Sequence, residues 1–133
     1  MLLELKKKWL AGISWQDIVA SNQKLCKIPE TPHKPGKGFE ATKQLWETTQ
    51  EKEITFREAV ELCRKGHDLK PFAFFNGNTM AVVSRKMVEE IQIQLPALES
   101  QIFCNSMTHY VAGVIENREF QAVCKHVDDF LKS

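Results

Sequence analysis

The chain has 133 residues, of which 43% are hydrophobic and 26% are charged, and this length and composition indicate one globular domain over residues 1–133. Eighteen basic and seventeen acidic residues leave a formal charge of +1, which excludes a strong overall field toward nucleic acid or an anionic membrane. No apolar run is long enough to cross a bilayer, and the first ten residues lack the order of a secretory signal, so we expect a cytoplasmic protein.

Local spacing predicts two helices and a loop in the N-terminal part. Apolar residues within positions 2–10 indicate a short first helix that ends near Gly12. Ser14 and Asp17 have the spacing of a capping box, so we expect a second helix to start directly after Ser14. The segment IPETPHKPGKG at residues 28–38 contains three prolines and two glycines, which exclude a helix and predict an exposed loop.

Two more helices are expected before residue 70. One begins at Phe39 and is short. The next begins at a second capping box, formed by Thr55 and Glu58. Its core-facing residues then recur at intervals of three and four: Phe56, Ala59, Val60, Cys63 and His67.

Three further helices follow the segment LKPFAFFNGNT at residues 69–79. The first is predicted to bury Met80, Val83, Met87 and Ile91. The second is predicted to bury Leu98, Ile102, Ser106, Tyr110 and Val114. The last has a polar side of Lys125, Asp128, Asp129 and Lys132, opposite an apolar side of Phe120, Val123, Cys124, Val127, Phe130 and Leu131. Because no segment alternates with a period of two for long enough to demand a sheet, we predict an all-α, compact single domain of six to seven helices.

The segment LKPFAFFNGNT combines an aromatic run with a polar turn. Pro71 stops the preceding helix, Asn76 and Gly77 are residues that tolerate positive φ, and a new helix is expected from Asn78 or Thr79. A helix N-terminus that follows such a turn presents unpaired N–H groups and a partial positive charge. The turn is therefore a candidate anion site.

The alternative for the same segment is a packed corner. In that case the Asn-Gly-Asn turn caps the second helix, and three aromatic side chains fill the angle between two helices: Phe72, Phe74 and Phe75. An exposed aromatic cluster would instead indicate a protein interface. Local chemistry leaves these alternatives open.

The order of a helix, Pro-Phe, three residues, Asn-Gly and a second helix resembles the core of the Fic family, whose motif reads His-Pro-Phe-x-Asp/Glu-Gly-Asn-Gly-Arg. Aligned without a gap, the motif falls with its Pro-Phe on Pro71 and Phe72 and its Asn-Gly on Asn76 and Gly77. The stretch AVELCRKGHDLKPF is similar to the family's upstream helix, and HYVAGVIENREFQAVCKHVDDFL is similar to its closing helices, so the resemblance covers residues 54–131. It implies an all-helical fold that transfers a nucleotide, most often AMP, to a protein hydroxyl.

The positions that carry catalysis in the family are not matched. Lys70 stands in place of the catalytic His, Phe74 in place of the acid that holds magnesium, and Asn78 in place of the terminal Arg. A lysine is a poor general base near neutral pH, and a phenylalanine cannot bind Mg²⁺. We therefore predict no catalytic residues, no cofactor and no magnesium-dependent AMP transfer.

The function that this degenerate motif predicts is binding of a protein partner, or of a nucleotide or phosphate, by a non-catalytic or atypical Fic-like protein. The anion contacts are expected from Lys70, Asn76, Gly77, Asn78 and Thr79. The wall of the site, or an interface, is expected from His67, Phe72, Phe74 and Phe75. No membrane partner is expected, and the formation of a homo-oligomer is left open.

Two alternatives remain. One is a helical interaction or regulatory domain without a small-molecule site. The other is a small helix-turn-helix DNA-binding protein, because LKKKWLAGISWQDIVASNQ, within residues 1–38, is similar to the first helix and turn of such domains. Its recognition face would carry Gln16, Asn22, Gln23 and Lys24. The nearly neutral net charge disfavours nucleic acid as a partner.

The cysteines and histidines offer a metal site as a further alternative. Cys63 and His67 lie four residues apart on one expected helix face, a spacing that can chelate a metal. Cys104 and His109 are five residues apart and point in different directions, so no second chelating pair is expected. The four cysteines are scattered without a CxxC pair, which predicts reduced and mostly buried thiols and no bound metal.

Overall fold

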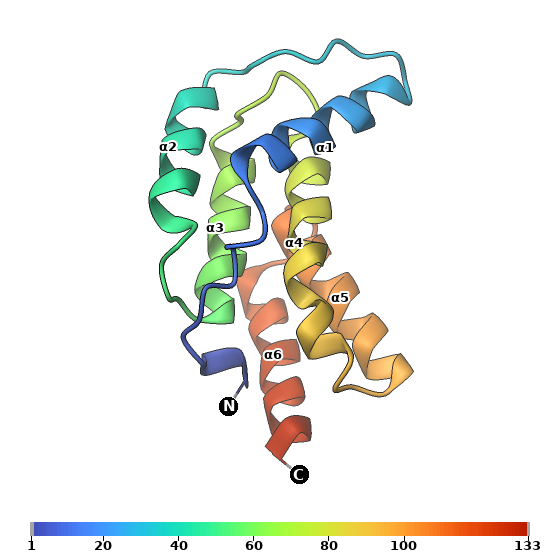
Figure 1. Ribbon diagram of the computed structural model, residues 1–133. Coiled ribbons are helices and arrows are strands. Elements are labelled where there is room, and N and C mark those ends of the chain that lie inside the picture. Colours follow the sequence, from blue (N-terminus) through green and yellow to red (C-terminus); the bar gives the residue numbers. More distant parts are fainter. Residues whose placement is uncertain (1, 133) are drawn as a thin grey trace.

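The structure is a computed structural model that describes residues 2–132, and helices joined by loops and turns make up its fold (Figure 1). The α-helices are α1 (Trp15–Lys27), α2 (Phe39–Thr49), α3 (Phe56–Asp68), α4 (Asn76–Gln92), α5 (Ala97–Val111) and α6 (Asn117–Lys132), and a 3-10 helix, η1, precedes them at Leu2–Glu4. Residues 2–132 contain no strand, only two isolated β-bridges. The predicted all-α fold is confirmed.

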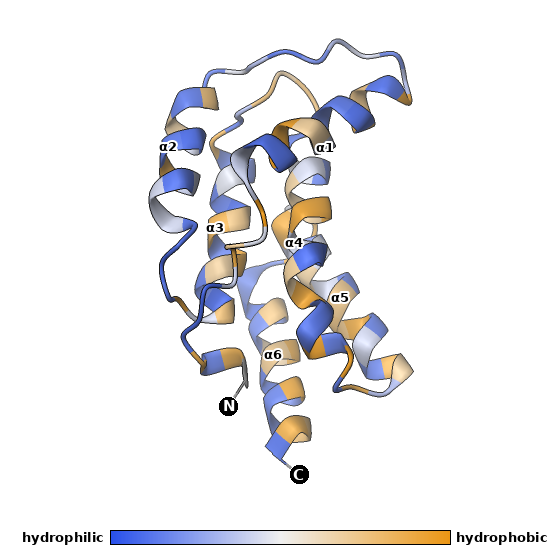
Figure 2. Cartoon of the chain, in the orientation of Figure 1, coloured by the Kyte–Doolittle hydropathy of each residue, from blue (hydrophilic) through white to orange (hydrophobic). Residues whose placement is uncertain are grey.

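The central helix of the fold is α4, which packs against α1, α3 and α5. Figure 1 shows α3, α4, α5 and α6 side by side, with α1 crossing one end of this group and α2 on the outer side of α3. Hydrophobic residues gather where the helices face one another (Figure 2). None of the helices in residues 2–132 is long and apolar enough to cross a membrane.

Large side chains from most of the elements fill one core. The largest that are fully buried include Trp46 of α2, Phe56 of α3, Phe103 of α5 and Phe120 of α6. Complete burial of a side chain of this class contributes roughly 1.5–3 kcal/mol to stability. The stripe predicted for α4, which is Met80, Val83, Met87 and Ile91, is buried as expected. Three of the four thiols are also buried, and all four are free.

Both predicted capping boxes are present. At the start of α1 the Asp17 N–H donates to Ser14 Oγ at 3.0 Å, and the Ser14 N–H donates to Asp17 Oδ2 at 2.9 Å. At the start of α3 the Glu58 N–H donates to Thr55 Oγ1 at 3.1 Å, and the Thr55 N–H donates to Glu58 Oε1 at 3.2 Å. Each box satisfies backbone donors that a helix start leaves without an acceptor.

The short first α-helix predicted within residues 2–10 is wrong. Beyond η1 this segment is extended, and Lys7 forms an antiparallel bridge with Ile54 through two backbone hydrogen bonds of 2.9 Å. Trp9 and Leu10 are buried in the core from the hydrogen-bonded turns that follow, at residues 9–12. Tertiary packing therefore overrides the helical spacing of the apolar residues.

The stripe predicted for α5 is also wrong, at three of its five positions. Leu98 is 66% exposed, Ile102 is 47% exposed and Val114 is 69% exposed. Tyr110 is buried as predicted, and the other residues of α5 that face the core are Phe103, Met107, Thr108 and Val111. Apolar residues occur on both sides of α5, so its periodicity does not distinguish the face that the core selects.

On α6, Asp128 is buried although we expected it on the polar side. Arg57 of α3 donates to Asp128 Oδ2 at 3.3 Å, which explains how a carboxylate is accommodated there. Burial raises the pKa of Asp128 above the usual range, and the positive charge of Arg57 opposes this shift. Phe120, Cys124 and Val127 are buried as predicted.

Candidate functional site

The candidate site is the turn that connects α3 to α4. The chain leaves α3 through the C-cap residue Leu69, and α4 begins at Asn76. The prediction that this helix starts at Asn78 or Thr79 is therefore two or three residues late. Its N-cap residue is Phe75, which cannot accept a hydrogen bond from the first turn and forms no side-chain cap.

We predicted the positive φ angles of the turn at Asn76 and Gly77. The structure places them elsewhere. They are at Lys70, with φ of 53°, and at Phe75, with φ of 61°. The reason is that Asn76 is held by two hydrogen bonds, from the Phe72 N–H to Asn76 Oδ1 at 2.8 Å and from Asn76 Nδ2 to the Phe72 carbonyl at 2.9 Å. The chain therefore reverses at Phe75, just before this anchored residue.

Gly77 is needed for close packing and not for a special φ. A Cβ atom at this position would lie 3.1 Å from His67 Cε1 and 3.2 Å from His67 Nε2. A Cβ atom at Gly113 would lie 3.3 Å from the same Cε1. His67 Nδ1 is 2.9 Å from the Val111 carbonyl, which only accepts, so Nδ1 carries the hydrogen. Two glycines thus leave space for one oriented, half-buried imidazole beside the first turn of α4.

The aromatic residues of the segment have different environments. Phe72 is 2% exposed, stacks on Trp15 with 6.0 Å between ring centroids, and meets Phe39 edge to face at 6.0 Å. Phe74 is 42% exposed, and Phe75 is half-buried. The packed-corner interpretation therefore describes Phe72, whereas Phe74 can line a site or an interface.

Residues 34–38 of the predicted loop lie along the turn, and we call them the strap. The Gly36 N–H donates to the Pro71 carbonyl at 2.8 Å, and the Gly38 N–H donates to the Lys70 carbonyl at 3.1 Å. The Ala73 N–H donates back to Lys34 at 3.0 Å. A Cβ atom on Gly38 would lie 1.7 Å from the Leu69 carbonyl oxygen, so only glycine fits there. The strap fixes the backbone of one side of the turn.

A buried amide, Asn22 of α1, fixes the other side. Asn22 Nδ2 donates to the Phe74 carbonyl at 2.8 Å and to Thr79 Oγ1 at 3.0 Å, and Asn22 Oδ1 accepts from His33 Nδ1 at 2.8 Å. Asn22 is fully buried, which contradicts its predicted place on an exposed recognition face. Sequence reasoning missed it because its partners are more than ten residues away.

The structure leaves only some of the predicted anion ligands at the surface. Thr79 is fully buried, and its N–H donates to the Phe75 carbonyl at 2.9 Å. Lys70 and Asn78 are exposed, and Gly77 is half-buried. The first N–H groups of a helix have no intrahelical acceptor, so those of Asn76, Gly77 and Asn78 are the donors that remain in this turn.

A polar cluster that sequence reasoning missed lies on the exposed side of α3, next to the end of α5. Tyr110 donates from its hydroxyl to Glu61 Oε1 at 2.6 Å, and Arg64 Nη1 donates to the Tyr110 carbonyl at 2.9 Å. Burial raises the pKa of Tyr110 to about 12, with the hydrogen bond to Glu61 acting in the same direction. The cleft at this cluster has a volume of about 570 Å³.

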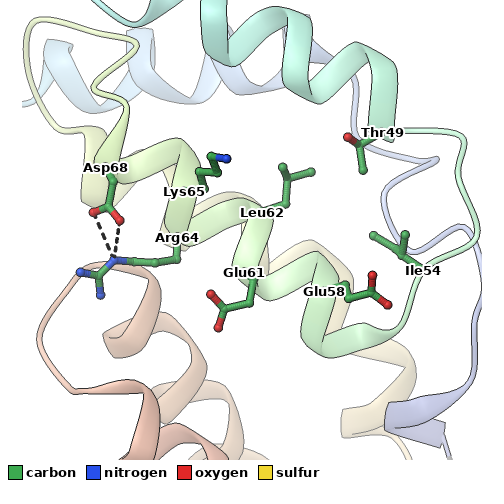
Figure 3. Close-up of a pocket in the computed structure, with 8 residues that line it drawn as sticks. All are labelled: Thr49, Ile54, Glu58, Glu61, Leu62, Arg64, Lys65 and Asp68. Carbon is green, nitrogen blue, oxygen red and sulfur yellow. Dashed lines mark hydrogen bonds and ion pairs between the residues drawn. The ribbon is translucent and has the colours of Figure 1, made fainter.

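The same face of α3 borders a second cleft, of about 440 Å³, toward α2. Figure 3 shows Arg64 paired with Asp68, while Leu62 and Lys65 point toward α2. The polar side chains that the two clefts share are Glu61, Arg64 and Asp68, and they are bonded to one another or to Tyr110. Each of these three side chains therefore has a hydrogen-bond partner within the chain.

The predicted pair of Cys63 and His67 is divided between two environments. Cys63 is fully buried, and burial raises the pKa of its thiol to about 12. His67 is directed to the Val111 carbonyl through Nδ1. No group of three or more potential metal ligands occurs within residues 2–132.

Comparisons with known proteins add no relative. The chain matches no protein-family model, and no curated protein or solved structure is similar to it. The resemblance to the Fic family thus stays a prediction from the residues of the turn and its flanking helices.

Proposed function

We propose that the chain is an atypical, non-catalytic Fic-like protein that binds a phosphate group, free or on a nucleotide, at the turn between α3 and α4. The observation that carries this proposal is the conformation of the turn. Lys70 and Phe75 are both non-glycine residues with positive φ, and they bracket it. Such angles cost of order 1–3 kcal/mol each and cluster at functional sites.

At the start of α4, no N-cap side chain accepts a hydrogen bond from the first-turn N–H groups. An Asn, Ser, Thr or Asp at the N-cap would accept from the first-turn N–H groups, whereas Phe75 leaves them without that acceptor. These N–H groups belong to a helix of 17 residues, whose N-terminus carries a partial positive charge. Lys70 adds an exposed ammonium group in the same turn. Together they favour a small anion such as a phosphate group.

The proposal excludes transfer chemistry because of the residues that stand in the motif positions. Lys70 replaces the base and Phe74 replaces the magnesium ligand of the family motif. His67 is committed through Nδ1 to a backbone carbonyl and packs against Gly77 in the first turn of α4. Binding, and not catalysis, is therefore the activity that we assign to the turn.

The DNA-binding alternative has little support. The segment that would form the first helix of the motif, residues 5–12, is a non-helical stretch followed by turns, and Asn22 of its recognition face is buried. Within the turn, a helical interaction domain is favoured by Phe74, which is the one well-exposed aromatic side chain there.

The test is thermal unfolding with inorganic phosphate, AMP, ADP or ATP at millimolar concentration. A ligand at a hundred times its Kd stabilises the fold by about 2.7 kcal/mol, which raises Tm by several degrees for a domain of this size. Lys70→Ala should remove most of this rise, whereas Lys37→Ala, a matched loss of one exposed lysine in the strap, should keep it. A Tm that none of the four compounds changes would refute the assignment.

A further inference from the structure

The outward face of α4 and α5 has a pattern that the proposed function does not use. On α4 the exposed residues recur three and four apart along one stripe: Val82, Arg85, Lys86, Glu89 and Ile93. On α5 a similar stripe carries Leu98, Gln101, Ile102, Asn105 and His109. We call these two stripes the outer face. The two helices pack extensively against each other.

The outer face has much of the exposed apolar surface. Nine large hydrophobic residues are exposed within the described chain, and five of them lie on the outer face or in the turn after α5: Val82, Ile93, Leu98, Ile102 and Val114. They form two groups at opposite ends. Ile93, Leu98 and Ile102 lie where α4 passes into α5, and Figure 2 shows hydrophobic colour at that turn. A cleft of about 460 Å³ at the other end is lined by Val82, Val114 and His109.

Within the α4 stripe two pairs of residues share one midpoint, whereas the mirror position of Arg85 is Glu90, which pairs with Lys7. Val82 and Ile93 are equally far from the point between residues 87 and 88, and so are Lys86 and Glu89. The sequence of chemical types is thus apolar, basic, acidic and apolar. A second α4 that runs antiparallel across this midpoint would place Val82 against the partner's Ile93. It would also place Lys86 against the partner's Glu89.

We propose that the outer face binds a second copy of this chain, so that the protein forms a homodimer with twofold symmetry. In this arrangement the apolar group at the α4–α5 turn of each copy enters the cleft lined by Val82 and Val114 of the other. The distance along α4 from Val82 to Ile93 is about 16 Å, from the rise of a helix. Within residues 2–132 neither Lys86 nor Glu89 forms a salt bridge, and the charge of Lys86 also acts on the carboxylate of Asp17 in α1.

The apolar groups would supply most of the affinity, and the charges would fix the orientation. A stable interface buries about 800 Å² on each partner, which requires the stripe of α5 as well as that of α4. These matches favour a second copy as the partner. In a twofold dimer each residue of the stripe meets its mirror position on an identical helix.

Sedimentation velocity across a dilution series tests the proposal with four proteins. The unmodified chain should dimerise. Lys86→Glu and Glu89→Lys each create two like-charge pairs across the twofold axis, and each should weaken the dimer by about tenfold or more. The double variant with both substitutions restores opposite charges and should recover the affinity of the unmodified chain.

Two further variants complete the experiment. Leu98→Lys should abolish the dimer because it charges the apolar group, whereas Lys125→Glu, on the exposed side of α6, should leave it unchanged. Thermal unfolding monitored by circular dichroism confirms that each variant is folded. An unmodified chain that stays monomeric up to millimolar concentration overturns the proposal. A double variant that dimerises no better than the single variants overturns it as well.

Discussion

The side-chain amide of Asn76 pairs with both backbone polar groups of Phe72, at 2.8 and 2.9 Å. The amide therefore acts as a short backbone segment that closes the turn. It sets the first residue of α4 and holds Phe72 in position for its stacking on Trp15. The conformation of the candidate site depends on this pair.

Asn76→Ala should destabilise the domain by about 1–3 kcal/mol, because it leaves the Phe72 N–H and carbonyl without partners in a part-buried place. Asn76→Asp keeps the acceptor for the Phe72 N–H and loses the donor to the Phe72 carbonyl. It should destabilise the domain less at low pH, where the protonated carboxyl group can donate again. Urea unfolding gives the free energies. Equal stability of Asn76→Ala and the unmodified chain would show that the amide does not hold the turn.

Gly77→Val should be destabilising through contact with His67 and not through backbone strain. The added atoms fall into the space beside Cε1 and Nε2 of the ring, where a Cβ atom alone would lie at 3.1 and 3.2 Å. In a His67→Ala background the same substitution should cost much less, which a double-mutant cycle measures as a coupling energy of about 0.5–3 kcal/mol. Additive effects of the two substitutions would contradict the packing that we describe.

Lys70→Gly should stabilise the protein in the absence of ligand. The left-handed conformation costs a residue with a Cβ atom about 1–2 kcal/mol, and glycine avoids this cost. Part of the gain is offset because glycine loses more conformational entropy when the chain folds. Lys70→Ala keeps the strain and should leave Tm nearly unchanged. Chemical unfolding of the two variants separates the strain from the charge, and a less stable glycine variant would contradict the φ of 53° at this residue.

Stability should fall between about pH 10 and pH 12 in a way that depends on Tyr110. Burial and the bond to Glu61 raise the folded-state pKa of Tyr110 to about 12, above a reference pKa of 10.0. A group with a raised pKa contributes stability that is complete below its unfolded pKa and is lost as the pH rises through its folded pKa. The free energy of unfolding, measured as the pH rises, should therefore fall more steeply for the unmodified chain than for Tyr110→Phe. Parallel pH profiles would contradict the shift.

Local chemistry predicted the features that depend on neighbours in the sequence. Ser14 with Asp17 and Thr55 with Glu58 start helices because each pair satisfies its own helix terminus. The buried face of α4 was also predictable, because apolar residues occupy mainly one side of that helix. This face consists of Met80, Val83, Met87 and Ile91.

The features that sequence reasoning missed depend on distant partners. Lys7 is extended because it bonds to Ile54, and Asp128 is buried because Arg57 reaches it from α3. Asn22 is a buried connection between α1 and the turn, whereas its polarity suggested an exposed face. Leu98 and Ile102 have the right spacing for the core but lie on the other side of α5. A single sequence does not show which distant residues contact one another, and these contacts determine the conformation and burial of the residues above.

The central claim is that the open first turn of α4 binds a phosphate group. The most direct measurement is a titration of the isotopically labelled protein with phosphate or ATP, followed by backbone ¹H–¹⁵N NMR. We expect the amide resonances of Gly77 and Asn78 to move most, because their N–H groups would donate to the anion. Unchanged resonances at these two residues with saturating ligand, or changes confined to another surface, would contradict the claim.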